Sequence, residues 1–315
     1  MKTLKIRLVL AGVAAVLAVS PALAAPKAPV EIRTTSPQGN VMAGEVILPE
    51  AAGPRPVVLL ISGTGRQSRD FESFGGRYRP HRDIAEALLA RDIGVIRFDE
   101  RNTGASTGDH KTARSADLQN DIASILDAAA KVPGVDPKRI YLFGHSEGAV
   151  LAERLSIERK DIAGIVLIGA PGKSGRLMTL DQNRVVTPRT PGMSDADFEK
   201  AVDAAQAKEV EFLKTRPSLN DLLELDALGL GRQVKVPALI LEGAEDWQVQ
   251  PPQGERLAKA MTEAGNREVT YRRLPRVGHL MTDNPPGVTD YDKLTDYAVA
   301  PSVLEAVTTW VSAHN

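Results

Sequence analysis

Short, almost uninterrupted apolar runs recur along this chain, and they constrain its fold more than any other feature of the sequence. Five of these runs are Val57–Ile61, Val95–Phe98, Ile140–Phe143, Ile165–Ile168 and Ala238–Leu241. Short runs with apolar residues at successive positions are typical of strands buried on both faces, as in a parallel sheet. The sequence therefore predicts a sheet that other elements cover on both sides.

Segments with helical periodicity separate these runs. Apolar residues recur three and four positions apart, as at Leu118, Ile122 and Ile125, and Ser302–Ala313 has the pattern of a closing helix. Three further strands are predicted at Val30–Thr34, Val41–Leu48 and, with more polar residues, Val269–Leu274. Alternating strands and helices predict an α/β fold with a doubly wound, mostly parallel sheet flanked by helices.

One segment interrupts this alternation. Residues 172–233 contain no strong strand but two helical patterns, a longer one at Asp195–Lys214 and a shorter one at Leu219–Leu228. We interpret the segment as a helical cap inserted over the carboxyl edge of the sheet. It would divide the core into residues 25–171 and 234–315. The alternative is a long crossover connection.

The first 24 residues have the pattern of a secretory signal peptide. Lys2, Lys5 and Arg7 precede the apolar run Leu8–Val19, and Ala22-Leu23-Ala24 fits the rule for cleavage after small residues. A membrane anchor is the alternative, but the run falls short of the ~20 residues that span a bilayer. We expect cleavage near Ala24 and a periplasmic or secreted protein without a stable membrane anchor.

Composition excludes several classes of function. Lys and Arg number 39 against 40 for Asp and Glu, so no basic excess exists for binding nucleic acid. The chain contains no cysteine, which excludes disulfides, thiolate metal sites and a cysteine nucleophile. The sequence does not indicate an oligomeric state.

The strongest chemical signal follows the run Ile140–Phe143. Gly144-His-Ser146-Glu-Gly148 is a G-x-S-x-G motif that stands directly after a predicted strand and before a predicted helix. In that context the serine occupies a sharp, strained turn whose close packing requires glycines. The motif alone is weak and also fits an ordinary glycine-rich turn, but its position predicts that Ser146 is a nucleophile.

A serine nucleophile needs a general base, because its hydroxyl is protonated at neutral pH. The chain has five histidines, of which His279 follows a late strand, where the base belongs in the order Ser…Asp/Glu…His. His81 and His110 precede the serine, His145 stands beside it in the turn, and His314 lies in the tail. His279 is therefore the predicted base.

The base needs a carboxylate to orient its ring. Asp246 follows the run Ala238–Leu241 and is the predicted partner, with Glu245 and Asp283 as alternatives. The oxyanion of the tetrahedral intermediate needs two N–H donors. The predicted donors are the backbone of Glu147, directly after the nucleophile, and of Thr64 in the loop Ser62–Gly65, with Gly65 as the alternative to Thr64.

These motifs give the chain a resemblance to the alpha/beta-hydrolase superfamily, in particular to serine esterases of the dienelactone-hydrolase and serine-aminopeptidase-like groups. The matching pieces are Ser62–Gly65, Asp99–Gly108, Gly144–Gly148, Gly243–Asp246 and Gly278-His279. The resemblance implies a Ser146, Asp246 and His279 triad. The Asp99–Gly108 segment is similar to the family's D-x-R-G-x-G-x-S loop but has Asn102 where glycine is usual, which is tolerable because Asn adopts positive φ readily.

The sequence thus predicts an exported hydrolase of small to medium carboxylic esters that needs neither metal nor cofactor. Possible lining residues from the cap are Leu177, Met178, Met193, Phe198 and Phe212. Three alternatives remain: a thioesterase or acyltransferase with the same triad, a peptidase of the prolyl-aminopeptidase type, and a non-catalytic binding protein. The peptidase needs a carboxylate for the substrate amine, for which Asp181 and Glu209 are the candidates.

Overall fold

The computed structural model of the protein describes residues 27–50 and 52–315. The signal peptide that we predict over residues 1–24 lies outside this part of the chain. Eight strands form one sheet in the order β1-β2-β4-β3-β5-β6-β7-β8. The strands are β1 Val30–Thr35, β2 Val41–Ile47, β3 Arg55–Ile61, β4 Gly94–Asp99, β5 Val135–His145, β6 Ile162–Ile168, β7 Ala238–Gly243 and β8 Val269–Leu274.

The sheet is mostly parallel. Strand β2 pairs antiparallel with both β1 and β4, whereas every pair from β4 through β3, β5, β6 and β7 to β8 is parallel. Parallel neighbours need crossover connections, and the helices between the strands supply them. The predicted fold class, a doubly wound and mostly parallel sheet flanked by helices, is confirmed.

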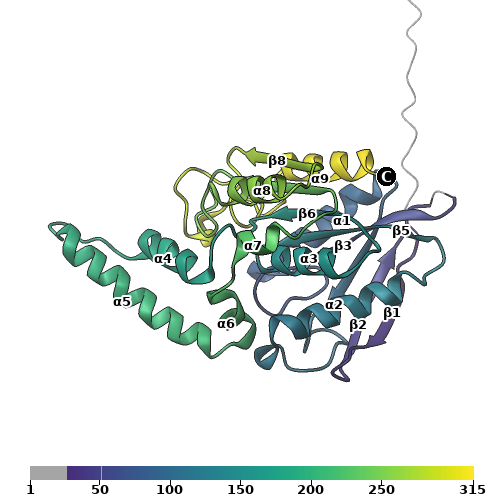
Figure 1. Cartoon of the computed structure of the whole chain (residues 1–315), viewed down its shortest axis with the longest axis horizontal. Coiled ribbons are helices and arrows are strands. Elements are labelled where there is room, and N and C mark those ends of the chain that lie inside the picture. The colour runs from purple at the N-terminus through teal and green to yellow at the C-terminus, as the bar shows by residue number, and fades with distance from the viewer. Residues whose placement is uncertain (1–26, 51) are drawn as a thin grey trace, which may run out of the picture.

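Helices cover both faces of the sheet (Figure 1). Helices α1 and α9 lie on one face, and α2, α3 and α8 lie on the other. Their bounds are α1 Pro80–Leu89, α2 Ser115–Ala129, α3 Glu147–Glu158, α8 Gln253–Glu263 and α9 Pro301–Ala313. Three short 3₁₀ helices lie in connections, η1 Phe74–Gly76, η2 His110–Thr112 and η3 Tyr291–Lys293.

Alternate residues of the central strands enter two separate cores. In β3, Val57 and Leu59 pack with the α2, α3 and α8 side, whereas Val58 and Leu60 pack with the α1 and α9 side. Successive side chains of a strand point to opposite faces, so a strand covered on both faces must be apolar at every position. This requirement explains the apolar runs in the sequence.

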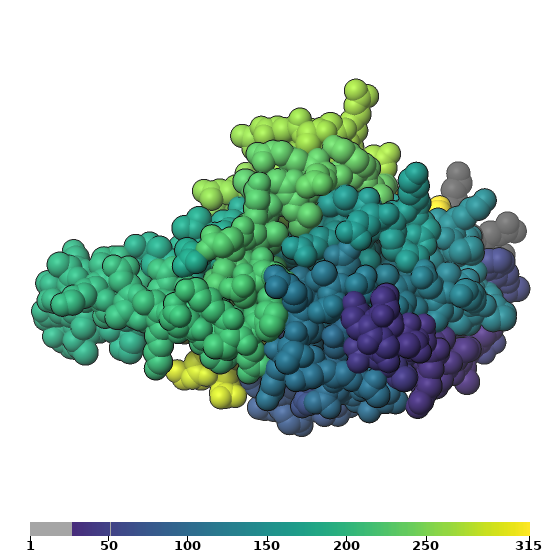
Figure 2. Space-filling view, turned by 60° about the horizontal axis from the view of Figure 1, so that its bottom comes forward, coloured from purple at the N-terminus to yellow at the C-terminus, as the bar shows by residue number. Residues whose placement is uncertain are grey.

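Four helices, α4 to α7, connect β6 to β7, and we call this segment the cap. They are α4 Gly175–Val186, α5 Asp195–Lys214, α6 Pro217–Leu223 and α7 Ala227–Gly231. In Figures 1 and 2 the green cap projects beside the body that contains the sheet, with α5 on its outer side. Only Val202 and Val210 of α5 are buried.

The sequence predicted two helices in this segment, and that count was wrong. The sequence did not predict helix α4, because the helix starts at Gly175 and polar residues are interspersed among its apolar ones. The pattern predicted over Leu219–Leu228 is broken into α6 and α7, because Asp226 accepts a hydrogen bond from the Gly229 N–H, 2.8 Å away, and so caps a new helix.

The Asp99–Gly108 loop is held by buried polar contacts. Asn102 adopts a φ of 58°, the conformation that its substitution for glycine requires. An Asp99 carboxylate oxygen accepts the Arg69 backbone N–H at 2.9 Å, and the Arg101 guanidinium contacts the Asp121 carboxylate at 3.0 Å. Asp99 and Arg101 thus hold the loop in place. Within residues 27–50 and 52–315, none of the helices combines the length and the apolar character needed to cross a bilayer.

Candidate active site

Ser146 occupies the turn between β5 and α3. Its φ of 55° and ψ of −117° lie in a region that side-chain-bearing residues rarely adopt. The Ser146 N–H donates a hydrogen bond to the carbonyl of Ile168, 3.0 Å away, which ties the turn to the end of β6. Strain of this kind persists only where the surroundings fix it, and it is common at functional sites.

The two glycines of the motif are required by close approach. A Cβ at Gly144 would overlap the carbonyl oxygen of Gly148, and a Cβ at Gly148 would overlap the carbonyl oxygens of Ile61 and Ser62. The turn is therefore pressed against the end of β3, and α3 can start directly behind Ser146. The G-x-S-x-G spacing is thus a steric consequence of how β3, β5 and α3 meet.

His279 and Asp246 meet at the carboxyl edge of the same sheet. The Nδ1 atom of His279 lies 2.9 Å from Oδ2 of Asp246. The other carboxylate oxygen of Asp246 accepts the backbone N–H groups of Gln248 and Val249 at 2.9 and 2.8 Å. Both side chains are buried, so the ring and the carboxylate have little freedom to separate. A proton held on Nδ1 leaves Nε2 free to accept another.

The two alternative carboxylates lie elsewhere. A Glu245 oxygen accepts the Gly287 N–H at 3.3 Å, and Asp283 forms an ion pair with Arg276 at 2.9 Å. Asp246 is the carboxylate that the structure brings to His279. This geometry favours Asp246 among the three candidates that the sequence left open.

His145 makes a contact that the sequence did not indicate. Its Nε2 lies 2.8 Å from the backbone carbonyl oxygen of His279. Burial lowers the pKa of His145 well below its ordinary value, so the neutral ring can donate from Nε2 to that carbonyl. The residue before Ser146 thus holds the backbone of the loop that carries the candidate base. The contact joins residues 145 and 279, which are far apart in the sequence, so no local sequence pattern predicts it.

Two backbone donors lie near Ser146. Glu147 is the first residue of α3, and Gly63 packs so closely that a Cβ there would lie 3.3 Å from the Ser146 Cβ, next to Thr64. Within the described residues, the N–H groups of Thr64 and Glu147 have no hydrogen-bond acceptor. Thr64 shares a cavity with Ser146, whereas Gly65 lies on a neighbouring cavity, which favours Thr64.

Ser146 and His279 line a cavity of about 200 Å³, which we call the active cavity. The two side chains line it without a direct hydrogen bond between them. The cap closes one side, mainly with apolar side chains. These are Met178, Leu213, Leu219, Leu222 and Leu223. Of the lining residues proposed from the sequence, Met178 lies here and Phe212 lies on the neighbouring cavity, while Leu177 is exposed to solvent.

The Glu147 side chain is buried near Glu100 and His110. Its Oε1 atom has no hydrogen-bond partner among the described residues. Burial, reinforced by the nearby Glu100 carboxylate, raises the pKa of Glu147 to about 7. A carboxylate in such surroundings is favoured in its neutral form. The described residues contain no cluster of three or more side chains that could hold a metal ion.

Comparison with known proteins places this geometry in a family. Esterase EstD of Thermotoga maritima is 24% identical over 279 residues, covering 86% of this chain and 66% of the relative. Dipeptidyl aminopeptidase BIII of Pseudoxanthomonas mexicana is 26% identical over 266 residues, covering 81% and 35%. The chain therefore spans about two thirds of the first relative's length and about one third of the second's.

Solved structures share the fold. An esterase from Pyrococcus furiosus superposes with a TM-score of 0.60 at 17% identity, covering 91% of this chain and 89% of that one. The model of the alpha/beta hydrolase family matches residues 58–290, which include the Ser146 turn, Asp246 and His279. Because this match covers most of the chain, the protein belongs to the alpha/beta hydrolase family.

Proposed function

We propose that the protein is an exported serine esterase that hydrolyses small to medium carboxylic esters. The observation that carries the proposal is the convergence of three residues: the strained Ser146 and His279 line one cavity, and His279 hydrogen-bonds Asp246 through Nδ1. The relatives named as esterases support the same activity. Export rests on the signal-peptide pattern of residues 1–24.

The mechanism follows from the positions of the groups. The Ser146 oxygen attacks the ester carbonyl carbon while Nε2 of His279 takes the hydroxyl proton. Asp246 keeps the ring oriented and stabilises the imidazolium. The N–H groups of Thr64 and Glu147 bind the oxyanion. His279 then gives its proton to the departing alcohol, and a water molecule, deprotonated by His279, hydrolyses the acyl-enzyme and restores Ser146.

A peptidase is the second candidate, because Glu209 lies on the active cavity and one relative is a dipeptidyl aminopeptidase. The Glu209 carboxylate already accepts a hydrogen bond from the Asn183 amide at 2.6 Å. Asp181, the other candidate, is paired with Lys173. Both carboxylates have partners within the cap, which makes them weaker anchors for a substrate amine and favours the esterase.

The test is hydrolysis of 4-nitrophenyl esters of increasing acyl length by the wild type, Ser146→Ala and the control Ser174→Ala. Ser174 precedes α4 and lies outside the active cavity. We expect activity in the wild type and the control, and a loss of at least about 10³-fold in Ser146→Ala. Equal activity in Ser146→Ala would refute the proposed nucleophile. Faster turnover of aminoacyl 4-nitroanilides than of esters would favour the peptidase.

A further inference from the structure

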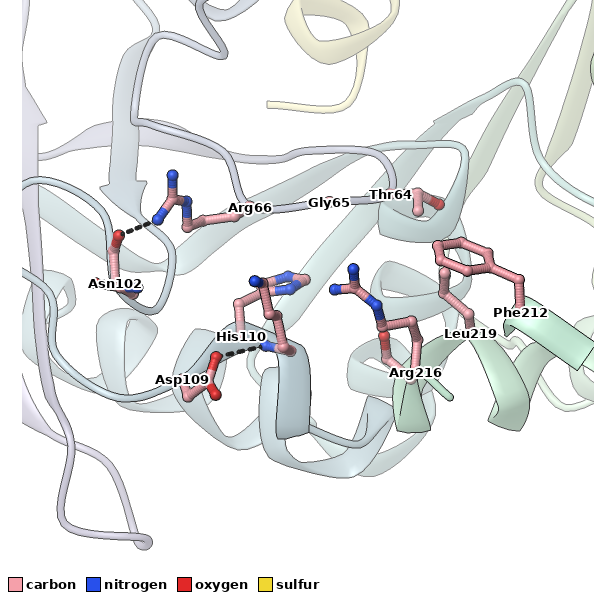
Figure 3. Close-up of a pocket in the computed structure, with 11 residues that line it drawn as sticks. Thr64, Gly65, Arg66, Asn102, Asp109, His110, Phe212, Arg216 and Leu219 are labelled. Atoms are coloured by element: carbon pink, nitrogen blue, oxygen red, sulfur yellow. Dashed lines mark hydrogen bonds between the residues drawn. The ribbon is translucent and has the colours of Figure 1, made fainter. Parts of the chain in front are cut away.

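A second cavity, of about 390 Å³, adjoins the active cavity. Thr64 and Leu219 line both, so the two spaces meet beside a candidate oxyanion donor. Loops of the core supply one wall and the cap supplies the other (Figure 3). We call this space the cationic cavity, because its lining includes Arg66, Lys111 and Arg216.

Within the part of the chain that the structure describes, these three cations form no ion pair with a carboxylate. His110, which lines this cavity, pairs with Glu100 at 3.4 Å. Among the described residues, no other lining residue takes part in an ion pair. Arg66 donates to the backbone carbonyl of Asn102 at 3.2 Å. The one carboxylate on the lining, Asp109, is engaged by the backbone N–H of Lys111 at 2.9 Å. Asp109 offsets one of the three positive charges, so the cavity keeps a net positive charge.

Arg216 is the best placed of the three to bind a ligand. It is half-buried at the start of α6, and its guanidinium lies 5.6 Å from the centre of the Phe212 ring. In Figure 3 the guanidinium extends into the cavity toward His110, with its N–H groups turned away from the cap. A planar guanidinium packed on an aromatic side chain is suited to two parallel hydrogen bonds to a carboxylate.

The buried carboxyl groups near the cationic cavity offset its positive charge only weakly. The Glu100 carboxylate is already paired with His110. Burial would lower the pKa of His110, but the hydrogen bond and charge of Glu100 outweigh it and raise that pKa. Burial favours the neutral form of Glu147, as described above. Glu209 lies on the active cavity and is bonded to Asn183.

The position of the base indicates which part of an ester would reach these cations. In the proposed mechanism His279 protonates the departing alcohol, so the alcohol must lie beside that ring. His279 lines the active cavity and not the cationic cavity. The acyl group then extends from the oxyanion site past Thr64, and the space beyond Thr64 is the cationic cavity.

We propose that the substrates are esters whose acyl part ends in a carboxylate, that is, monoesters of dicarboxylic acids, and that Arg216, with Arg66 and Lys111, binds this carboxylate. The alcohol part is apolar and lies under the leucines of the cap. This inference rests on the proposed esterase activity and names its substrate class.

The test compares two acyl chains of equal length, in mono-4-nitrophenyl adipate and 4-nitrophenyl hexanoate. We expect kcat/KM to be about tenfold higher or more for the adipate, because a hydrogen-bonded charge pair is worth at least that much. The preference should fall about tenfold in Arg216→Gln. It should fall by a smaller factor in Arg66→Gln, and because Arg66 is exposed, this substitution should leave folding intact. Arg232→Gln, an exposed arginine of the cap outside both cavities, should keep the wild-type preference.

A second ester pair places the charge on the alcohol, 4-(hexanoyloxy)benzoate and its methyl ester. The proposal expects no preference for this anion. It would be overturned if the adipate were not preferred, if Arg216→Gln and Arg66→Gln both kept the preference, or if the anion were favoured only on the alcohol. If one of these results occurred but the hexanoate were still hydrolysed in a Ser146-dependent way, the esterase proposal would stand. If neither ester were hydrolysed, both proposals would fail.

Discussion

The core and the cap differ in how their sequences determine their structure. In the core, β3, β4, β6 and β7 are each buried at all positions but one at most, and the turn at Ser146 is fixed by backbone contacts with β3 and β6. In the cap, the longest helix, α5, buries only Val202 and Val210. A rigid core suits catalytic groups that must hold their geometry, and a loosely packed cap suits the contacts that select a substrate.

The largest expected difference concerns catalysis. Asp246→Asn should lower kcat by about 10³–10⁴-fold, because an amide at this position favours the wrong His279 tautomer. The fold should survive, since an Asn oxygen can still accept the Gln248 and Val249 N–H groups. Steady-state kinetics and thermal unfolding measure the two effects. Asp181→Asn in the cap is the matched control, and a comparable loss of kcat there would contradict the division of roles.

A pair of truncations compares packing in the two regions. Leu88 is fully buried in the core between α1 and the sheet, whereas Leu177 on α4 is 51% exposed. Leu88→Ala should lower the free energy of unfolding by about 2–5 kcal/mol, through lost burial and the cavity that remains. Leu177→Ala should change it by less than about 0.5 kcal/mol. Urea unfolding measures both, and equal losses would show that α4 is buried in solution.

The stability of the core is expected to depend on pH through Glu147. Its pKa rises from 4.5 to about 7 on folding, so between these values the folded protein keeps a proton that the unfolded chain has lost. This group therefore weakens folding as the pH rises through that window. Relative to the wild type, Glu147→Gln should gain about 2–3 kcal/mol of stability between pH 4 and pH 8. Urea unfolding at both pH values measures the gain. The exposed Glu211→Gln of the cap is the control, and a Glu147→Gln curve parallel to that of the wild type would contradict the account.

The smallest expected effect lies in the cap. Asp226→Ala removes the side chain that caps α7 and should cost about 1 kcal/mol. Amide hydrogen exchange should accelerate in α6 and α7 and stay unchanged in the central strands. Faster exchange of the β3 and β5 amides by the same factor would show that cap and core unfold as one unit.

The same contrast explains what the sequence could predict. Burial on both faces leaves an apolar run, so β3, β4, β6 and β7 were located from the sequence to within three residues at either end. Strand β5 starts at Val135, before the predicted Ile140. The prediction missed the start of this strand because residues 136–139 are polar or proline and are not buried. Helix α4 was missed because its apolar residues do not gather on one buried face: Leu177, Val185 and Val186 are exposed.

The site divides in a similar way. Ser146, Asp246 and His279 could be proposed as site residues from the sequence because each stands at the end of a recognisable strand or in a short motif. The contact between His145 and the His279 carbonyl joins positions far apart in the sequence and makes no pattern in it. The cationic cavity brings together Arg66, Lys111 and Arg216 from three separate segments, and only the packing of the cap on the core places them side by side.

The central claim is that the core activates Ser146 as a nucleophile. The most direct measurement is to treat the wild-type protein with a fluorophosphonate probe at neutral pH and locate the adduct by peptide mass spectrometry. The account predicts a single adduct on Ser146, which is lost in Ser146→Ala and strongly slowed in Asp246→Asn. No adduct on the folded wild type, or an adduct on a different serine that persists in Ser146→Ala, would contradict it.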